Sequence, residues 1–354
     1  MNDHKNAPSP ARRPTIADVA EAAGVSRTTV SHALNDRGQV DPRTRERVKT
    51  IAASLGYRPN LRAQRLRTGR SNCIALLSSM PFAVAGGPSR LGFMMEIAAT
   101  ATEAALKQGL ALVLVPPMQE ARGLLDELDI DGAVIIEPVA NDPQVEQLQR
   151  RGLDVISIGR QPAMSRALPY VDLQGGATGR MLLEHLRTQG ARRIALLIGE
   201  QPRHSYVDVE QAYRDFCHEY RMDCLVARAD EAGGEAAGAR ACQALLQQHP
   251  EIDAICAPVD AFAVGAVSAL QSLGIRVPDD VMVATRYDGL RARNCTPPLT
   301  AVDLHLEQVA SLAIELLFEH INGSNGRTLV RAPAAELVAR ESTRSPVGSR
   351  SEGP

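Results

Sequence analysis

Near the start of the chain, apolar residues recur among polar ones with the 3.6-residue period of a helix. Apolar side chains recur at this spacing from Ile16 to Ala23, and Gly24 follows as a stop signal. Thr15 and Asp18 have the spacing of a capping box, in which each side chain accepts a hydrogen bond from the other residue's backbone N–H. The pattern predicts a short amphipathic helix between these signals.

Two more short helices are predicted directly afterwards. Ser26 is placed to cap the second helix, and Asp41 is placed to cap the third. The third helix begins with Pro42, which is favoured at a first helical position, and ends at Gly56. The residues expected to face the core are Val30, Ala33 and Leu34 in the second helix, and Val48, Ile51, Ala52 and Leu55 in the third. Three helices of this size can form a minimal core.

From residue 72 the pattern changes to short apolar strands that alternate with amphipathic helices. Continuous apolar strands separated by helices are typical of parallel sheets covered on both faces. The predicted strands span 73–77, 110–115, 132–136, 154–158, 193–198, 253–256 and 281–285, and the clearest helices span 93–107, 178–188 and 261–273. The expected organisation is a disordered tail (1–14), a three-helix domain (15–57), a basic linker (58–71), an α/β body (72–344) and a disordered tail (345–354).

Charge is divided unevenly between the two parts of the chain. Residues 1–71 hold 14 Lys and Arg against 6 Asp and Glu, a net charge of +8, whereas the remaining residues hold 25 against 35, a net charge of −10. A basic head of this kind favours a polyanionic partner, because neutralising phosphates releases counterions. A well-solvated basic face without a partner is the alternative that charge alone leaves open.

Composition narrows the class of protein further. Hydrophobic residues make up 44% of the chain, and no apolar run approaches the ~18 residues that a membrane span needs. The first 14 residues do not read as a secretion signal, so we expect a cytoplasmic protein with no membrane partner. The scattered cysteines form no CxxC pair and are expected to be reduced, buried and structural. They are Cys73, Cys217, Cys224, Cys242, Cys256 and Cys295.

The run TIADVAEAAGVSRTTVSHALN from Thr15 to Asn35 closely resembles the DNA-binding head of the lactose-repressor (LacI/GalR) family of transcription factors. The resemblance continues through the linker and through three signatures in the body. These are Val277-Pro278-Asp279-Asp280-Val281, Pro298-Leu299-Thr300 and Arg340-Glu341-Ser342-Thr343. It implies a helix-turn-helix regulator, most simply a repressor, that binds a palindromic DNA operator as a homodimer and responds to a small-molecule effector.

In such a head the second helix enters the major groove with its first residues at the base edges. Arg27 could pair with guanine, Thr28 could meet a thymine, and His32 could reach a further base pair. The alternative for Arg27 is a phosphate contact, and for His32 an exposed side chain without a base contact. Residues better suited to phosphates or to the rim of the interface are Thr15, Ser26, Thr29, Ser31 and Asn35.

The resemblance also implies a hinge helix that folds in the minor groove when the operator is bound. Asn60, Ala63 and Leu66 match the family's hinge, and Leu66 would wedge between base pairs at the centre of the site. The alternative for Leu66 is packing against the partner's hinge, which the wedge would also need.

For the body the resemblance implies two doubly wound lobes with an effector between them, at the strand ends where such folds bind ligands. The first lobe is expected over 72–160 plus a segment returning after Thr300, and the second lobe over 171–294. Residues that match the family's effector pocket, or lie beside it, are Ser79, Phe82, Ser205, Val209, Asp260, Tyr287 and Asp288.

Several of these positions depart from the family's pattern. Val209, Val259 and Gly159 stand where many relatives carry a polar residue, an aspartate in the case of Gly159, and the chain has no tryptophan. Arg286 and Arg160 could instead bind an anion, because a guanidinium matches a carboxylate or phosphate. We therefore expect a small organic anion as effector. The alternatives are that each arginine pairs with a neighbouring acid such as Asp288, and that the effector is a sugar after all.

An enzyme on a doubly wound fold and a transport binding protein are the competing classes. The sequence has no Gly-x-Ser-x-Gly elbow, no GxxxxGK phosphate loop and no HExxH zinc helix. A transport protein would need a secretion signal and no DNA-binding head. We expect neither class, and no cofactor or metal.

Overall fold

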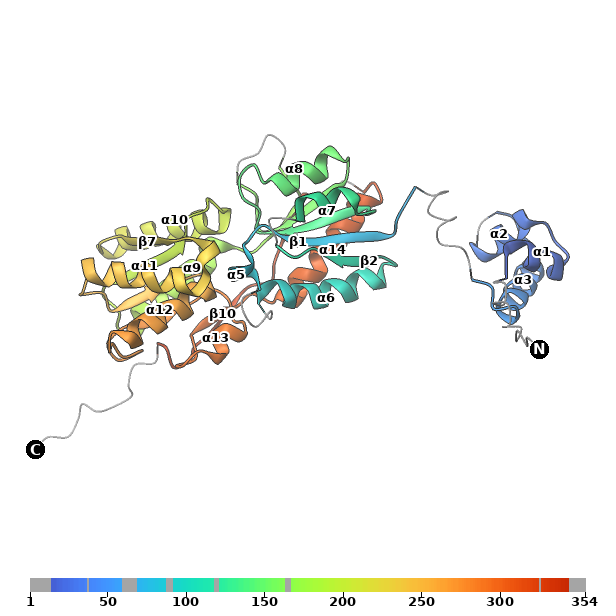
Figure 1. Cartoon of the computed structure of the whole chain (residues 1–354). Coiled ribbons are helices and arrows are strands. Elements are labelled where there is room, and N and C mark those ends of the chain that lie inside the picture. Colours follow the sequence, from blue (N-terminus) through green and yellow to red (C-terminus); the bar gives the residue numbers. More distant parts are fainter. Residues whose placement is uncertain are drawn as a thin grey trace, which may run out of the picture. The chain divides into compact units, whose positions relative to one another are not determined.

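The computed structural model of the protein describes residues 14–36, 38–58, 69–86, 92–117, 121–162, 167–324 and 326–343. The chain divides into two compact units that join between Arg70 and Ser71. The first unit is a head of three short helices, and the second is an α/β body with two lobes (Figure 1).

The head contains α1 (Ile16–Ala23), α2 (Arg27–Leu34) and α3 (Pro42–Ser54). Each helix begins at the predicted cap, and Thr15 and Asp18 form the predicted capping box. The three helices bury a core of small and branched side chains. Its members are Val19, Ala20, Ala23, Val30, Ala33, Val48 and Ala52. The expectation that Leu55 faces this core is wrong, because α3 ends one residue earlier and leaves the Leu55 side chain 38% exposed.

The first lobe of the body is built on a six-stranded sheet in the order β11-β5-β4-β3-β1-β2, in which every pairing is parallel. Its strands are β1 (Cys73–Ser78), β2 (Ala111–Leu114), β3 (Gly132–Ile136), β4 (Asp154–Ile158), β5 (Tyr170–Asp172) and β11 (Leu329–Arg331). Its helices are α5 (Phe82–Ala85), α6 (Phe93–Lys107), α7 (Ala121–Glu127), α8 (Pro143–Arg150) and α14 (Leu306–Ile321).

Both faces of this sheet are covered, as the continuous apolar strands predict. Successive residues of a strand point to opposite faces. In β1, Ile74 and Leu76 join the core beneath α6 and α14, whereas Ala75 and Leu77 join a second core beneath α7 and α8. The strand is therefore apolar continuously from Cys73 to Leu77 rather than at alternate positions.

The second lobe holds a four-stranded parallel sheet in the order β7-β6-β8-β9. Its strands are β6 (Ile194–Gly199), β7 (Leu225–Ala229), β8 (Ala254–Cys256) and β9 (Met282–Ala284). Its helices are α9 (Gly175–Thr188), α10 (His204–Tyr220), the 3-10 turn η1 (Glu231–Gly233), α11 (Gly234–Gln248), α12 (Asp260–Ser272) and α13 (Leu290–Asn294). Helix α9 packs on α10 and α11 packs on α12. The fold class that the sequence predicts is confirmed.

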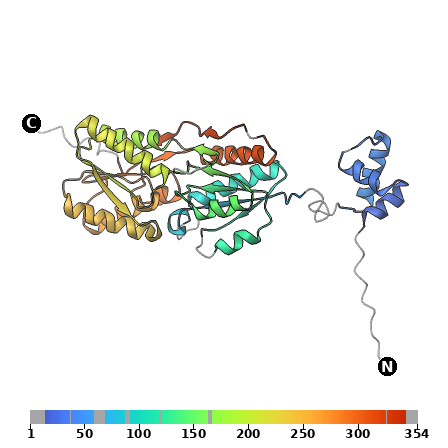
Figure 2. The same cartoon turned by 90° about the horizontal axis from the view of Figure 1, so that it is seen from above.

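The chain passes between the lobes more than once. After the second lobe it returns to the first, where α14 packs on β3 and β4 and where β11 pairs with β5. Strands β10 (Ala301–Asp303) and β12 (Glu336–Val338) form a separate antiparallel pair. Beyond them the chain returns to the second lobe, because the backbone N–H of Val283 donates to the carbonyl of Ser342 at 3.1 Å. In Figure 2 the two lobes lie side by side, with the yellow and orange segments in the second.

The sequence pattern did not predict five of the strands, namely β5, β7, β10, β11 and β12. All but β7 have three residues, and the edge strand β7 carries the exposed Arg228, so none of them forms a continuous apolar run. All six cysteines are free, but the expectation that all are buried is wrong: Cys73 and Cys295 are half-buried and Cys224 is exposed. Among the described helices, none combines the length and the apolar character that crossing a membrane would require.

Candidate functional site

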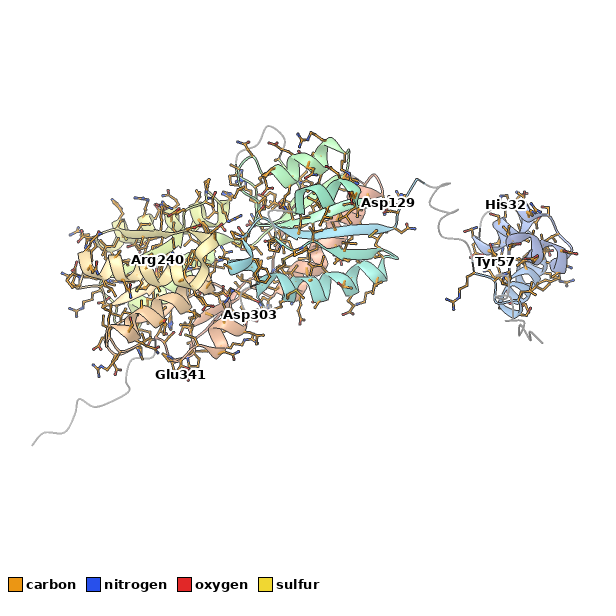
Figure 3. All side chains as sticks on the ribbon, in the orientation of Figure 1. His32, Tyr57, Asp129, Arg240, Asp303 and Glu341 are labelled. Atoms are coloured by element: carbon orange, nitrogen blue, oxygen red, sulfur yellow. The ribbon has the colours of Figure 1, made fainter. Side chains whose placement is uncertain are left out.

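The exposed face of α2 carries the residues that the sequence predicts to read DNA. Ser26 caps the helix by accepting a hydrogen bond from the backbone N–H of Thr29 at 3.0 Å. Arg27 and Thr28 follow as the first two helical residues, and both are exposed. His32 is exposed one turn later (Figure 3). A helix N-terminus with exposed polar side chains is the part of a helix-turn-helix that meets base edges.

Hydrogen bonds within the head already engage several of the polar groups expected at phosphates. The hydroxyls of Ser26 and Thr29 lie 2.9 Å apart, so one of them donates to the other and the remaining hydroxyl hydrogen of the pair stays available. The amide of Asn35 donates to the carbonyl of Ser31 at 2.7 Å, and the hydroxyl of Thr15 donates to Asp18. In this structure these side chains form hydrogen bonds at the ends of the helices. The hinge candidates Asn60, Ala63 and Leu66 lie outside the described residues.

The turn between α2 and α3 is held by ion pairs. Lys49 and Arg45 both approach the carboxylate of Asp36 at 3.0 Å, and they lower the pKa of Asp36, with Lys49 as the largest cause. Gly38 has a positive φ of 65°, and a Cβ there would come within 2.7 Å of the imidazole of His32. The histidine ring therefore lies against this turn, where the positive φ at position 38 favours glycine.

A small pocket, with a cavity volume of about 50 Å³, lies between the two lobes of the body. The loops that line it follow the carboxyl ends of strands β1, β3, β8 and β9, which is where doubly wound sheets bind ligands. Its apolar lining includes two aromatic rings, Phe93 and Tyr287, which meet edge to face with their centroids 5.2 Å apart. Its polar lining is Glu137, Ser205, Asp260 and Arg286. Of the predicted effector residues, four therefore line this pocket: Ser205, Asp260, Arg286 and Tyr287.

Two buried carboxylates in this pocket each have an oxygen without a hydrogen-bond partner. Glu137 is 3% exposed; its Oε2 accepts from the hydroxyl of Ser205 at 2.6 Å, but its Oε1 accepts no hydrogen bond. Asp260 is 5% exposed; its Oδ1 accepts from Arg291 at 3.1 Å, but its Oδ2 has no partner. Burial raises the pKa of Asp260, although Arg291 opposes the shift. An unsatisfied buried oxygen is costly, so both atoms are suited to a donor from a ligand.

The arginines expected at an anion do not present free positive charge to the pocket. Arg286 does line it, but its Nη2 lies 3.5 Å from Glu137 Oε1, and the two charges offset one another. Arg160 is not among the lining residues; it is exposed, and its Nη1 lies 3.2 Å from the Nε2 of His204. The sequence interpretation correctly considered an acid as the partner of Arg286, but named Asp288 instead of Glu137.

Other expected pocket residues lie elsewhere. Val209 is fully buried within α10, where it packs against Gly179 of α9, so its side chain belongs to the core. Asp288 forms an ion pair with Arg340 at 2.7 Å and holds the returning chain; burial acts to raise its pKa, but Arg340 and Arg293 lower it overall. Ser79 and Phe82 line a second, more open groove beside the pocket. The hydroxyl of Ser79 donates to Asp142 there.

A buried arginine that the sequence analysis missed joins the two lobes beside the pocket. Arg203, 1% exposed, is the last residue before α10 and pairs through two nitrogens with Glu231, at 2.6 and 2.7 Å. Its guanidinium also donates to the backbone carbonyls of Glu137 and Ser79 in the first lobe. The same Glu231 accepts from the hydroxyl of Tyr206 at 2.6 Å. No periodic pattern marks these residues, but Glu137 does carry a signal, since it directly follows a buried strand.

Family models match both parts of the chain. Residues 15–60 match the model of bacterial regulatory proteins of the lacI family, and residues 183–343 match a periplasmic binding protein-like domain. Over 341 residues the chain is 30% identical to the HTH-type transcriptional regulator CelR of Thermobifida fusca, a match that covers 94% of this chain and 98% of the relative. It is 29% identical over 348 residues to the ribose operon repressor of Halalkalibacterium halodurans, covering 96% and 99%.

Solved structures agree with the described fold. A complex of the transcriptional regulator CelR with cellobiose aligns with a TM-score of 0.69 at 29% identity, covering 93% of this chain and all of the other. A lac repressor dimer bound to operator and the anti-inducer ONPF aligns with a TM-score of 0.72 over 94% of this chain and all of the other, and at 22% identity it supports the fold alone. From its head, its two-lobed body and these matches, the chain belongs to the LacI family of bacterial regulatory proteins and is a DNA-binding transcriptional regulator.

Proposed function

We propose that the protein binds a palindromic operator as a homodimer, with Arg27, Thr28 and His32 at the base edges. Three features support these roles: the exposure of the three side chains, their place at the start of α2, and the ion pairs that fix the following turn. A dimer with two such heads matches the two half-sites of a palindrome. Asn60, Ala63 and Leu66 are proposed to form the hinge in the minor groove, and the cytoplasm is the expected compartment because the operator lies there.

The effector that the pocket suits best is a neutral polyhydroxyl compound, most simply a sugar. The observation that carries this proposal is the pair of buried acceptor atoms, Glu137 Oε1 and Asp260 Oδ2, which lack a hydrogen-bond partner in the pocket. Hydroxyl groups can donate to both atoms, whereas the oxygens of an anion would face like charge. This reverses the expectation of an organic anion, which depended on Arg286 and Arg160 being free.

The apolar part of the pocket fits the same class of effector. The absence of tryptophan suggested a pocket without aromatic faces, but Phe93 and Tyr287 both line it. The carbon-bound hydrogens of a sugar ring pack well against such faces, while its hydroxyls need the convergent polar groups opposite. The relative CelR, which was solved with cellobiose, is consistent with this class.

We expect titration calorimetry of the full chain to detect binding of at least one member of a panel of cellobiose, ribose and glucose. Binding to the folded state raises the unfolding temperature by mass action, so a thermal-shift assay should report the same sugar. Citrate and inorganic phosphate serve as charge controls and should give neither signal. Binding of citrate or phosphate, together with no response to any sugar, would contradict the proposed effector class.

A further inference from the structure

Glu137 links the first lobe to the second through both its side chain and its backbone. It directly follows β3 and has a positive φ of 50°, an uncommon conformation for a residue with a side chain. Its Oε2 accepts from Ser205 and its carbonyl accepts from Arg203, both of which belong to the second lobe. A single residue at the end of one strand therefore bridges the cleft in which the effector is proposed to bind.

The carboxylate of Glu137 fills the space that a side chain at Gly159 would need. Gly159 follows the neighbouring strand β4 and has a φ of 85°. A Cβ built on it would lie 3.1 Å from both Cδ and Oε1 of Glu137. Position 159 is also where, by the family resemblance, many relatives carry an aspartate. The acid therefore reaches the pocket from β3, and glycine at 159 makes room for it.

The oxygen nearest to Gly159 is also the one that accepts no hydrogen bond. Glu137 Oε1 forms an ion pair with Arg286 Nη2 at 3.5 Å but accepts no hydrogen bond, whereas Oε2 already accepts one from Ser205. A hydrogen bond to a charged acceptor is worth more than one between neutral groups, and an effector hydroxyl at Oε1 would supply it.

Building on the effector site proposed above, we propose that Glu137 is the residue that selects the effector. It accepts a hydroxyl on Oε1 and, through Ser205 and Arg203, connects the bound effector to the second lobe. The carboxylate of Glu137 takes the place that the carboxylate of an aspartate at position 159 would occupy. Either position can therefore supply the one acidic group of this part of the pocket. They are not independent, and placing an acid at both would crowd the same space.

A double-mutant cycle without any effector tests the spatial part of this proposal. Four forms of the full chain are compared: wild type, Glu137→Ala, Gly159→Asp and the double variant. Gly159→Asp should lower the unfolding temperature of the wild type by about 3 °C or more, because it overpacks the space beside Glu137. In the Glu137→Ala background the fall should be clearly smaller. Backbone strain at residue 159 lowers the unfolding temperature equally with and without the Glu137 side chain. An equal fall in the two backgrounds would therefore show that the side chains at positions 137 and 159 do not compete for one space.

Calorimetry with cellobiose, ribose and glucose tests the role in effector selection. Glu137→Gln preserves the size of the side chain and should weaken the sugar that wild type binds by about 10- to 100-fold, the loss expected for a charged hydrogen bond. Adding Gly159→Asp to Glu137→Ala should recover part of the affinity or change which sugar is preferred. Glu307→Gln, an exposed change on α14, should leave binding unchanged.

The outcomes separate this inference from the proposed effector class. Sugar binding by Glu137→Gln at wild-type affinity would overturn the role of Glu137 while leaving a sugar as effector. If wild type bound no sugar, the effector class and the selecting role would both fail, and the unfolding cycle would still decide whether the two positions share one space.

Discussion

Arg203→Met is expected to lower the free energy of unfolding of the body by about 3–5 kcal/mol, the usual cost of removing one partner from a buried ion pair. The side chains of Arg203 and Glu231 are each 1% exposed, so water does not solvate either charge. The change would leave the Glu231 carboxylate without its cation, and the carbonyls of Glu137 and Ser79 without a donor. Urea unfolding followed by circular dichroism measures the loss.

The matched control for this prediction is the double variant Arg203→Met, Glu231→Leu. Replacing both members of a buried pair with apolar residues is often neutral, so the double variant should recover much of the lost stability. If the single variant lost less than ~1 kcal/mol, the pair would behave like an exposed ion pair, which contradicts its burial. If the double variant were as unstable as the single one, the carbonyl contacts across the lobes would dominate instead.

Gly265→Ala is expected to destabilise the second lobe strongly, although alanine is the better helix former. A Cβ on Gly265 of α12 would come within 2.1 Å of the carbonyl oxygen of Glu235 in α11, so the two helices would have to separate. Overpacking typically costs about 1–3 kcal/mol and occasionally more. Because the obstacle is backbone rather than a mobile side chain, we expect a loss at the upper end of this range in urea unfolding.

Gly176→Ala provides the control within the same lobe. Gly176 lies in the first turn of α9. A Cβ on Gly176 would lie 3.7 Å from the carbonyl oxygen of Asp208, its nearest neighbour, which is an ordinary contact. Here the higher helix propensity of alanine should prevail, with a gain of up to ~1 kcal/mol. Equal effects of the two substitutions would show that the close approach of α11 and α12 does not limit residue 265.

Local patterns predicted the elements of this fold well because their causes lie within a few residues. The caps Thr15, Ser26 and Asp41 each satisfy N–H groups of the helix that follows, so their positions can be read from the sequence. The strand 132–136 is buried on both faces and forms a continuous apolar run. Strand β7, exposed along one edge, has no such run and was missed.

The candidate site could be predicted only in part, because its contacts join distant segments. Arg286 lines the pocket, but its partner Glu137 lies about half of the body earlier in the chain, and no spacing rule connects them. Val209 was expected near the effector because its position matches one in the family's pocket. A match of position does not show which way a helical side chain points, and the Val209 side chain points into the core against Gly179. A resemblance identifies the loop, whereas the direction of each side chain depends on packing.

Binding of a palindromic operator by a homodimer is tested by selecting binding sites for the full chain from a pool of randomised duplex DNA. We expect enriched sequences with two inverted half-sites, one for each head of a homodimer. With the selected duplex, Arg27→Ala should cost ~1–3 kcal/mol and relax the base preference at one position of each half-site, whereas Arg192→Ala, an exposed change in the second lobe, should cost nothing. An absence of enriched sequences, or enriched sites without two-fold symmetry, would contradict operator binding by a homodimer.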